Sequence, residues 1–282
     1  MGLNLLRGRA PVLSISLETF APGTLPELLE RAEDAGFPGV ELPAHGGGTG
    51  FHAPTISTAE RDSLADQMRA FRLVSAAAPY QETFDVTLVS PSAAIRRASL
   101  SEIWSVCRFL GTVASETSGL PVVVLRSGVP PMGVPDSQGD TWLSESLYTL
   151  ERTAREQGVL LGLVSRDRFR RLGDLPPLLQ AGFTQIGIAL DIGHLRDMGE
   201  PLPDILRFIE SYPEQIVYIR VPADPDLARQ LGPVLHEVGY GGMVTLSPDR
   251  DDLAMLPAAY HIWRAILSLA DSSPHEPHDD PA

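Results

Sequence analysis

Residues 186–194, IGIALDIGH, decide the fold of this chain. An apolar run ends in Asp191, and His194 follows three residues later. This order predicts a buried strand that brings a carboxylate and an imidazole together just past its C-terminal end. Parallel α/β barrels carry their functional groups at that end of their strands. The stretch therefore predicts both a parallel sheet and the place of a candidate site.

Short apolar runs alternate with longer amphipathic segments along the whole chain. The runs predict strands at Val12–Ser16, Gly39–Leu42, Arg72–Ala77, Val122–Leu125, Val159–Val164, Gln185–Leu190, Gln215–Val221 and Met243–Leu246. The amphipathic segments predict helices at Leu25–Ala35, Thr58–Phe71, Ser92–Ser118, Thr141–Gln157, Leu175–Ala181, Asp204–Ser211, Asp226–Val238 and Leu253–Ala270. The strands are apolar throughout rather than alternating, as parallel strands buried on both faces are.

Eight strand–helix repeats in roughly 250 residues predict a (β/α)8 barrel, an α/β fold, as a single domain over residues 1–270. The alternative is a doubly wound open sheet, which needs fewer strands and usually a G-x-G-x-x-G turn after the first one. Here the first turn reads LETFA, residues 17–21, and lacks these glycines. The barrel is therefore the better prediction.

Composition excludes several classes of protein. The net charge of the 282-residue chain is −14. An acidic surface repels phosphate backbones, so we expect no nucleic-acid partner. Residues 271–282 are polar and acidic and predict a disordered tail. No apolar run approaches the ~20 residues that span a bilayer, and no signal peptide is visible, so we expect no membrane partner and a cytoplasmic location. Cys107 is the only cysteine, which excludes an internal disulfide.

Four motifs, in order, resemble the xylose-isomerase-like barrels, a superfamily of sugar and sugar-phosphate isomerases and epimerases. They are LLERAEDAGFPGVEL at 28–42, GVLLGL at 158–163, LDIGH at 190–194 and GYGGMVTL at 239–246. The resemblance covers nearly the whole barrel. It implies an isomerase or epimerase that acts on a small polyol or sugar derivative.

In active members of this superfamily, a Glu, an Asp, a His and a Glu at the ends of strands five to eight bind a divalent metal, and the two Glu residues move protons. Here Asp191 retains the strand-six ligand. Strand five ends in Val164 and Ser165, Arg220 stands where His is expected, and Ser247 stands where the last Glu is expected. One carboxylate does not hold a hard divalent ion tightly, so we expect no metal cofactor.

The replacements suggest a different kind of site. Arg126 follows strand four, Arg166 follows strand five and Arg220 lies in strand seven. We predict that their guanidinium groups face the mouth of the barrel and that Arg220 pairs with Asp191 or Glu41. Such a pocket suits an anionic sugar, sugar acid or phosphate. The alternative is a plain ion pair that neutralises Asp191 at the rim. The residues that we expect to bind ligand are Arg126, Arg166, Arg220 and Ser247.

Two functions stay open. An enzyme of this kind needs an acid/base pair, for which Glu41, Asp191 and His194 are the catalytic candidates; His194 matches a superfamily residue that contacts substrate. The other function is a non-catalytic barrel that binds a small anionic ligand or partners a true enzyme. A metal-dependent DNA-repair endonuclease on the same scaffold is disfavoured, because the chain lacks the ligands and the basic surface. A homodimer is the commonest assembly for such a protein.

Two loops near the predicted mouth also stand out. His45 and His52 flank a Gly-rich loop and could line the mouth, although a lone loop histidine is more often solvated. The loop Ser127–Asp140 is long and rich in proline, which suggests either a lid or a contact with a neighbouring subunit.

Overall fold

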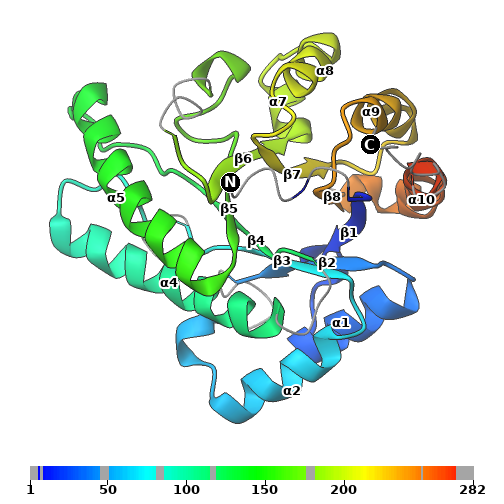
Figure 1. Cartoon of the computed structure of the whole chain (residues 1–282), viewed down its shortest axis with the longest axis horizontal. Coiled ribbons are helices and arrows are strands. Elements are labelled where there is room, and N and C mark those ends of the chain that lie inside the picture. The colour runs from blue at the N-terminus through cyan, green and yellow to red at the C-terminus, as the bar shows by residue number, and fades with distance from the viewer. Residues whose placement is uncertain are drawn as a thin grey trace, which may run out of the picture.

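The eight strands of the barrel close into a single parallel ring. The computed structural model describes residues 6, 9–44, 51–80, 86–114, 119–175, 182–248 and 250–270. Each strand pairs with the next in the chain, and the last pairs with the first. Figure 1 shows the helices arranged around the outside of this ring. The predicted (β/α)8 barrel is therefore confirmed, and the predicted tail at 271–282 lies outside the described residues.

The strands have nearly the predicted bounds. They are β1 (Val12–Ser16), β2 (Gly39–Pro43), β3 (Leu73–Ala77), β4 (Val122–Leu125), β5 (Leu160–Val164), β6 (Ile186–Asp191), β7 (Ile216–Val221) and β8 (Met243–Leu246). The α-helices are α1 (Leu25–Asp34), α2 (Thr58–Met68), α4 (Ala93–Ala114), α5 (Asp136–Gln157), α7 (Ile192–Asp197), α8 (Leu202–Ser211), α9 (Pro225–Glu237) and α10 (Leu256–Ala270). The 3-10 turns are η2 (Leu17–Phe20), η3 (Ala53–Thr55), η4 (Leu172–Asp174) and η5 (Arg250–Met255).

The connection after β6 corrects the sequence prediction. Asp191 is the last residue of the strand rather than the first residue beyond it, and the short helix α7, which was not predicted, follows at once. The side chain of Asp191 accepts a hydrogen bond from the backbone N–H of His194 at 3.1 Å and so caps α7. Residues 176–181 of the helix predicted at Leu175–Ala181 lie outside the described part of the chain.

Helix α5 begins at Asp136 rather than at Thr141, which shortens the predicted loop before it. Pro135, with a φ of −59°, is the N-cap residue of this helix. The negative charge of Asp136 in the first turn stabilises the positive N-terminal end of the helix dipole. The guanidinium group of Arg168 also donates to Asp136 at 3.1 Å and to Asp140 at 2.5 and 2.8 Å. These bonds tie the start of α5 to the loop that follows β5.

The barrel interior changes from apolar to polar toward the C-terminal ends of the strands. Its apolar part includes Val12, Val122, Leu160 and Met243. A Cβ atom on Gly162 of β5 would lie 3.0 Å from the Cβ atom of Ala189, so only glycine fits between these strands without displacement. The buried hydroxyl groups of Ser14 and Thr245 share a hydrogen bond of 2.5 Å. The polar end of the interior therefore coincides with the mouth of the barrel.

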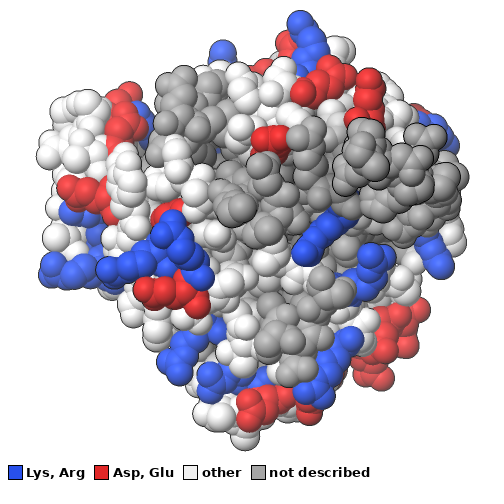
Figure 2. Space-filling view, in the orientation of Figure 1, with Lys and Arg blue, Asp and Glu red and all other residues white. Residues whose placement is uncertain are grey.

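The surface carries both signs of charge. On the face in Figure 2, Arg side chains lie among Asp and Glu side chains. In the described part of the chain, no helix combines the length and the apolar character that a membrane span needs.

Candidate functional site

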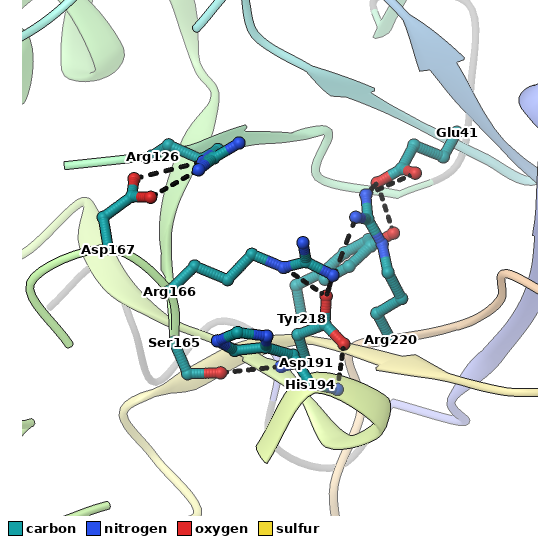
Figure 3. Close-up of polar contacts among 9 residues, drawn as sticks. All are labelled: Glu41, Arg126, Ser165, Arg166, Asp167, Asp191, His194, Tyr218 and Arg220. Atoms are coloured by element: carbon teal, nitrogen blue, oxygen red, sulfur yellow. Dashed lines mark hydrogen bonds and ion pairs between the residues drawn. The ribbon is translucent and has the colours of Figure 1, made fainter. Parts of the chain in front are cut away.

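A buried ion pair crosses the barrel between β2 and β7 (Figure 3). Glu41 has a side chain that is 1% exposed, and its two carboxylate oxygens accept hydrogen bonds from Nη2 of Arg220 at 2.6 and 2.7 Å. The hydroxyl of Tyr218 also donates to this carboxylate. Burial alone would lower the pKa of Arg220, but the nearby charge of Glu41 outweighs it and raises the pKa well above its usual value. Arg220 is therefore held in its charged form.

A second carboxylate, Asp191, lies beside this pair at the end of β6. It accepts hydrogen bonds from Nε of Arg166 at 2.9 Å, and Nη2 of Arg166 lies 2.8 Å from the same oxygen. Nη1 of Arg220 lies 3.9 Å away. Burial would raise the pKa of Asp191, but the guanidinium groups of Arg220 and Arg166 hold it below its ordinary value. The backbone N–H of Asp191 donates to the buried hydroxyl of Ser165 at 2.9 Å.

A separate ion pair joins the ends of β4 and β5. Asp167 accepts from Nε of Arg126 at 3.1 Å, from Nη2 of the same side chain, and from the backbone N–H of Gly128 at 3.1 Å. Its backbone adopts a φ of 58°, in the left-handed region that Asp tolerates better than most residues. The guanidinium group of Arg126 lies 4.6 Å from the ring centre of Tyr80. This geometry holds the Arg126 head group in one place at the rim.

Arg166 is the guanidinium group of the mouth with the greatest access to solvent. Its side chain is 37% exposed, against 22% for Arg126 and 19% for Arg220. Its Nε and Nη2 face Asp191, whereas its Nη1 forms no hydrogen bond with the described residues. In Figure 3 its head group lies over Asp191 and the ring of His194. Arg166 therefore has the most accessible side chain of the three arginines at the mouth.

His194 lies on α7 with its ring half-buried. Its Nε2 atom is buried and has no hydrogen-bond partner among the described residues. Burial lowers the pKa of His194, and the charge of Arg166 lowers it further. An imidazole with a lowered pKa is mostly uncharged at pH 7 and has one nitrogen able to accept a proton. Glu41 and Asp191 accept hydrogen bonds at both carboxylate oxygens. Of the three predicted acid/base residues, His194 is therefore the one that keeps an atom without a described partner.

The residues that carry these contacts do not fit a divalent metal. In the described part of the chain, no three His, Cys, Asp or Glu side chains are grouped as a metal site. Asp191, the one superfamily ligand retained, has an oxygen bonded by Arg166 and close to Arg220. A guanidinium group has no lone pair to give to a metal and carries a fixed positive charge that repels one.

The structure brings most predicted site residues together. Arg220 pairs with Glu41 and lies near Asp191, so the predicted pairing is confirmed. Arg126 forms its own pair at the rim. Ser247 follows β8 half-buried, and its only described hydrogen bond is from its backbone N–H to the carbonyl of Val221 at 2.9 Å. The roles of these residues in catalysis or ligand binding stay predictions.

Two contacts of the site were not predicted. Tyr218 lies two residues before Arg220 on the same strand, and the period-two alternation of a strand places both side chains on one face. That signal was present in the sequence. Asp167 gave no such signal, because its role depends on a left-handed backbone.

Neither of the two loop histidines is found in the arginine–carboxylate cluster of the mouth among the described residues. His45 falls outside the described residues. His52 does not join the mouth cluster: its Nε2 atom lies 2.8 Å from a carboxylate oxygen of Glu102 on α4, and its ring lines a different cavity.

Comparison with known proteins yields likeness at the level of structure. No protein-family model matches the chain, and no curated protein sequence matches it. The structure resembles a D-psicose 3-epimerase from Clostridium cellulolyticum H10, with a TM-score of 0.72, 16% identity and coverage of 91% of this chain and 99% of the other. It also resembles a 3-keto-D-glucoside 4-epimerase from E. coli, with a TM-score of 0.63, 15% identity and coverage of 93% and 100%.

The structure also resembles a xylose isomerase domain protein from Planctomyces limnophilus, with a TM-score of 0.63, 16% identity and coverage of 94% of this chain and 99% of the other. Identities this low show a common fold and leave the activity open. The chain therefore shares the barrel fold of these three proteins.

Proposed function

We propose that the mouth of the barrel binds a small anionic sugar derivative without a divalent metal. The observation that carries this proposal is that both buried carboxylates, Glu41 and Asp191, are already paired with guanidinium groups. Positive charge in this mouth therefore comes from arginine. Arg166, whose side chain is the most exposed of the three, is the residue that meets the charged end of the ligand.

The fold supports a ligand of sugar size. The solved structures that cover nearly all of this chain include a D-psicose 3-epimerase and a 3-keto-D-glucoside 4-epimerase. Ligands of barrels with this architecture bind at the C-terminal mouth, where the present cluster lies. Fold-level analogy thus supports the sugar part of the ligand, and the arginine side chains support its negative charge.

A panel of three probes tests the proposal by calorimetry. D-Gluconate carries a carboxylate, D-ribose 5-phosphate carries a phosphate, and D-fructose is uncharged. We expect the two anions to bind and D-fructose to bind at least tenfold more weakly, because charge-assisted hydrogen bonds to arginine are stronger than neutral ones. Binding of D-fructose as tight as that of either anion, or no binding of any of the three, would contradict the proposal.

The metal content of the purified protein is the second measurement. Protein prepared without a metal-binding tag and incubated with Mn²⁺, Mg²⁺, Co²⁺ or Zn²⁺ is expected to retain far less than one equivalent of any of them. The reason is that Arg166 and Arg220 neutralise Asp191 and Glu41. Elemental mass spectrometry after desalting gives the ratio, and a near-stoichiometric ion that survives desalting would show that this part of the proposal is wrong.

A metal-free isomerase or epimerase is a second candidate function, favoured by His194. Its ring is mostly uncharged at pH 7 and its Nε2 has no described partner, so a small rotation that exposes this buried nitrogen would let it accept a proton from a ligand. Glu41 is less suited, because both its oxygens accept hydrogen bonds from Arg220. The sequence contains no lysine, which leaves no side chain for Schiff-base chemistry.

Proton exchange distinguishes the two candidates. The protein is incubated in D2O with D-ribulose 5-phosphate, and proton NMR follows the C–H groups next to the carbonyl. If the protein is an enzyme, one of these signals is lost as deuterium replaces the proton, and His194→Ala abolishes this exchange. If the protein only binds its ligand, calorimetry detects binding and every C–H signal stays unchanged.

A further inference from the structure

A cavity of about 490 Å³ lies outside the mouth cluster, between helices α1 and α2 and the turn η3. These helices are neighbours on one side of the barrel (Figure 1). The apolar part of its lining includes Leu25, Phe51, Ile56 and Leu64. Pockets of roughly 300–1,000 Å³ with mostly apolar walls and a few polar groups are typical binding sites for small molecules. No lining residue belongs to the arginine–carboxylate network of the mouth.

The two helices that border the cavity begin beside it, and both N-termini are already capped by carboxylates. Glu27 accepts a hydrogen bond from the backbone N–H of Thr24 at 2.8 Å, before α1. Glu60, which lines the cavity, accepts one from the backbone N–H of Ser57 at 2.9 Å, before α2. These hydrogen bonds hold the pKa of both carboxyl groups below its usual value. The positive potential of the helix N-termini is therefore compensated within the protein, and an anionic ligand gains little there.

A carboxylate on α4 contacts one of the residues that line the cavity. Glu102 lies 2.8 Å from Nε2 of His52, a residue that lines the cavity. Their side chains are 31% and 24% exposed, so the pair is reachable from solvent. With Glu60 among its lining residues, the cavity combines mostly apolar walls with one carboxylate.

We propose that this cavity is a second ligand site, which takes a small aromatic compound that carries a basic nitrogen. The ring lies against Leu25, Phe51 and Leu64, which are buried apolar side chains. The cationic group faces the carboxylate of Glu60 at the rim. The proposal is independent of the function of the mouth, because the two sites share no residue.

Three one-ring probes that differ in charge test the chemistry of the site. Benzamidine is a cation, phenol is neutral and benzoate is an anion. In titrations followed by protein NMR, we expect benzamidine to bind most tightly and benzoate most weakly, at least tenfold apart. Benzoate binding equal to or tighter than that of benzamidine would overturn the proposal.

Two variants place the binding in this cavity. Ser63 lines the cavity on the exposed face of α2, so Ser63→Phe fills part of the space and is expected to weaken benzamidine at least tenfold. Ser101→Phe, at an exposed position of α4 outside the lining, is the matched control. Its dissociation constant for benzamidine is expected to stay within twofold of that of the parent protein. Unchanged benzamidine binding by Ser63→Phe would show that the site lies elsewhere.

Glu60→Gln isolates the charge while keeping the helix cap, because Gln fills the same capping position as Glu. We expect benzamidine to bind about threefold more weakly to this variant and phenol to bind as before, in keeping with the modest strength of exposed ion pairs. Equal benzamidine binding by this variant and the parent protein would remove Glu60 from the proposal and with it the preference for cations.

Discussion

Replacing Arg220 with Met is expected to destabilise the protein by about 3–5 kcal/mol, the usual cost of leaving one member of a buried ion pair without its partner. The carboxylate of Glu41 is 1% exposed and would lose both hydrogen bonds from Arg220. Tyr218 would remain as a donor but brings no charge. Denaturant unfolding, monitored by circular dichroism, gives the free energy of unfolding. A loss below about 1 kcal/mol would mean that Glu41 is better solvated than its burial implies.

Two further proteins make the measurement specific. Arg207→Met on α8 removes an exposed arginine that pairs with Asp204 three residues earlier, and it is expected to change stability by less than about 1 kcal/mol. The double variant Glu41→Gln/Arg220→Met removes both buried charges. It is expected to recover most of the loss, because replacing a whole buried pair by uncharged groups is far less costly than breaking it.

Replacing Arg166 with Gln is expected to weaken D-gluconate binding by roughly tenfold to a hundredfold, because a hydrogen bond to a charged group contributes about 1.5–3 kcal/mol. Nη1 of Arg166 is the donor that no described residue engages. Isothermal titration calorimetry of variant and parent measures the ratio of the two dissociation constants.

Arg171→Gln is the matched control for this prediction. Arg171 is exposed in the connection between β5 and β6. Its backbone N–H donates to the carboxylate of Asp174 at 3.0 Å, and its carbonyl accepts from the backbone N–H of Asp174 at 3.0 Å. We expect this variant to bind D-gluconate within twofold of the parent protein. Equal losses in both variants would indicate a general effect of net charge and would argue against a specific contact at Arg166.

The sequence was enough to predict the barrel because parallel strands are buried on both faces. Val12–Ser16, Val122–Leu125 and Met243–Leu246 were predicted with the bounds that the structure has, since each is a short apolar run between turn residues. Helix α7 was missed because its six residues, IGHLRD, are too few to show a helical period. Its one signal was Asp191, a residue type that favours the N-cap position.

The site was predictable in part for a similar reason. Glu41 lies in the middle of β2 and Arg220 near the end of β7, three strands away around the ring, so once the barrel is known their side chains are expected to meet in its interior. Which carboxylate each arginine chooses depends on side-chain packing that no local pattern records. Arg126 thus pairs with Asp167, forty-one residues later, because the left-handed backbone at Asp167 turns its carboxylate toward β4.

The coupling of charges in the mouth has a consequence for protein engineering. A designer who followed the superfamily pattern that the sequence resembles would place carboxylates at Val164 or Ser165 and at Ser247, and an imidazole in place of Arg220. Each exchange made alone would add an unpaired charge near Asp191 or leave Glu41 without its cation. Arg166 would also have to leave Asp191 before that carboxylate could coordinate an ion. The redesign is therefore expected to succeed best as one coordinated set of substitutions.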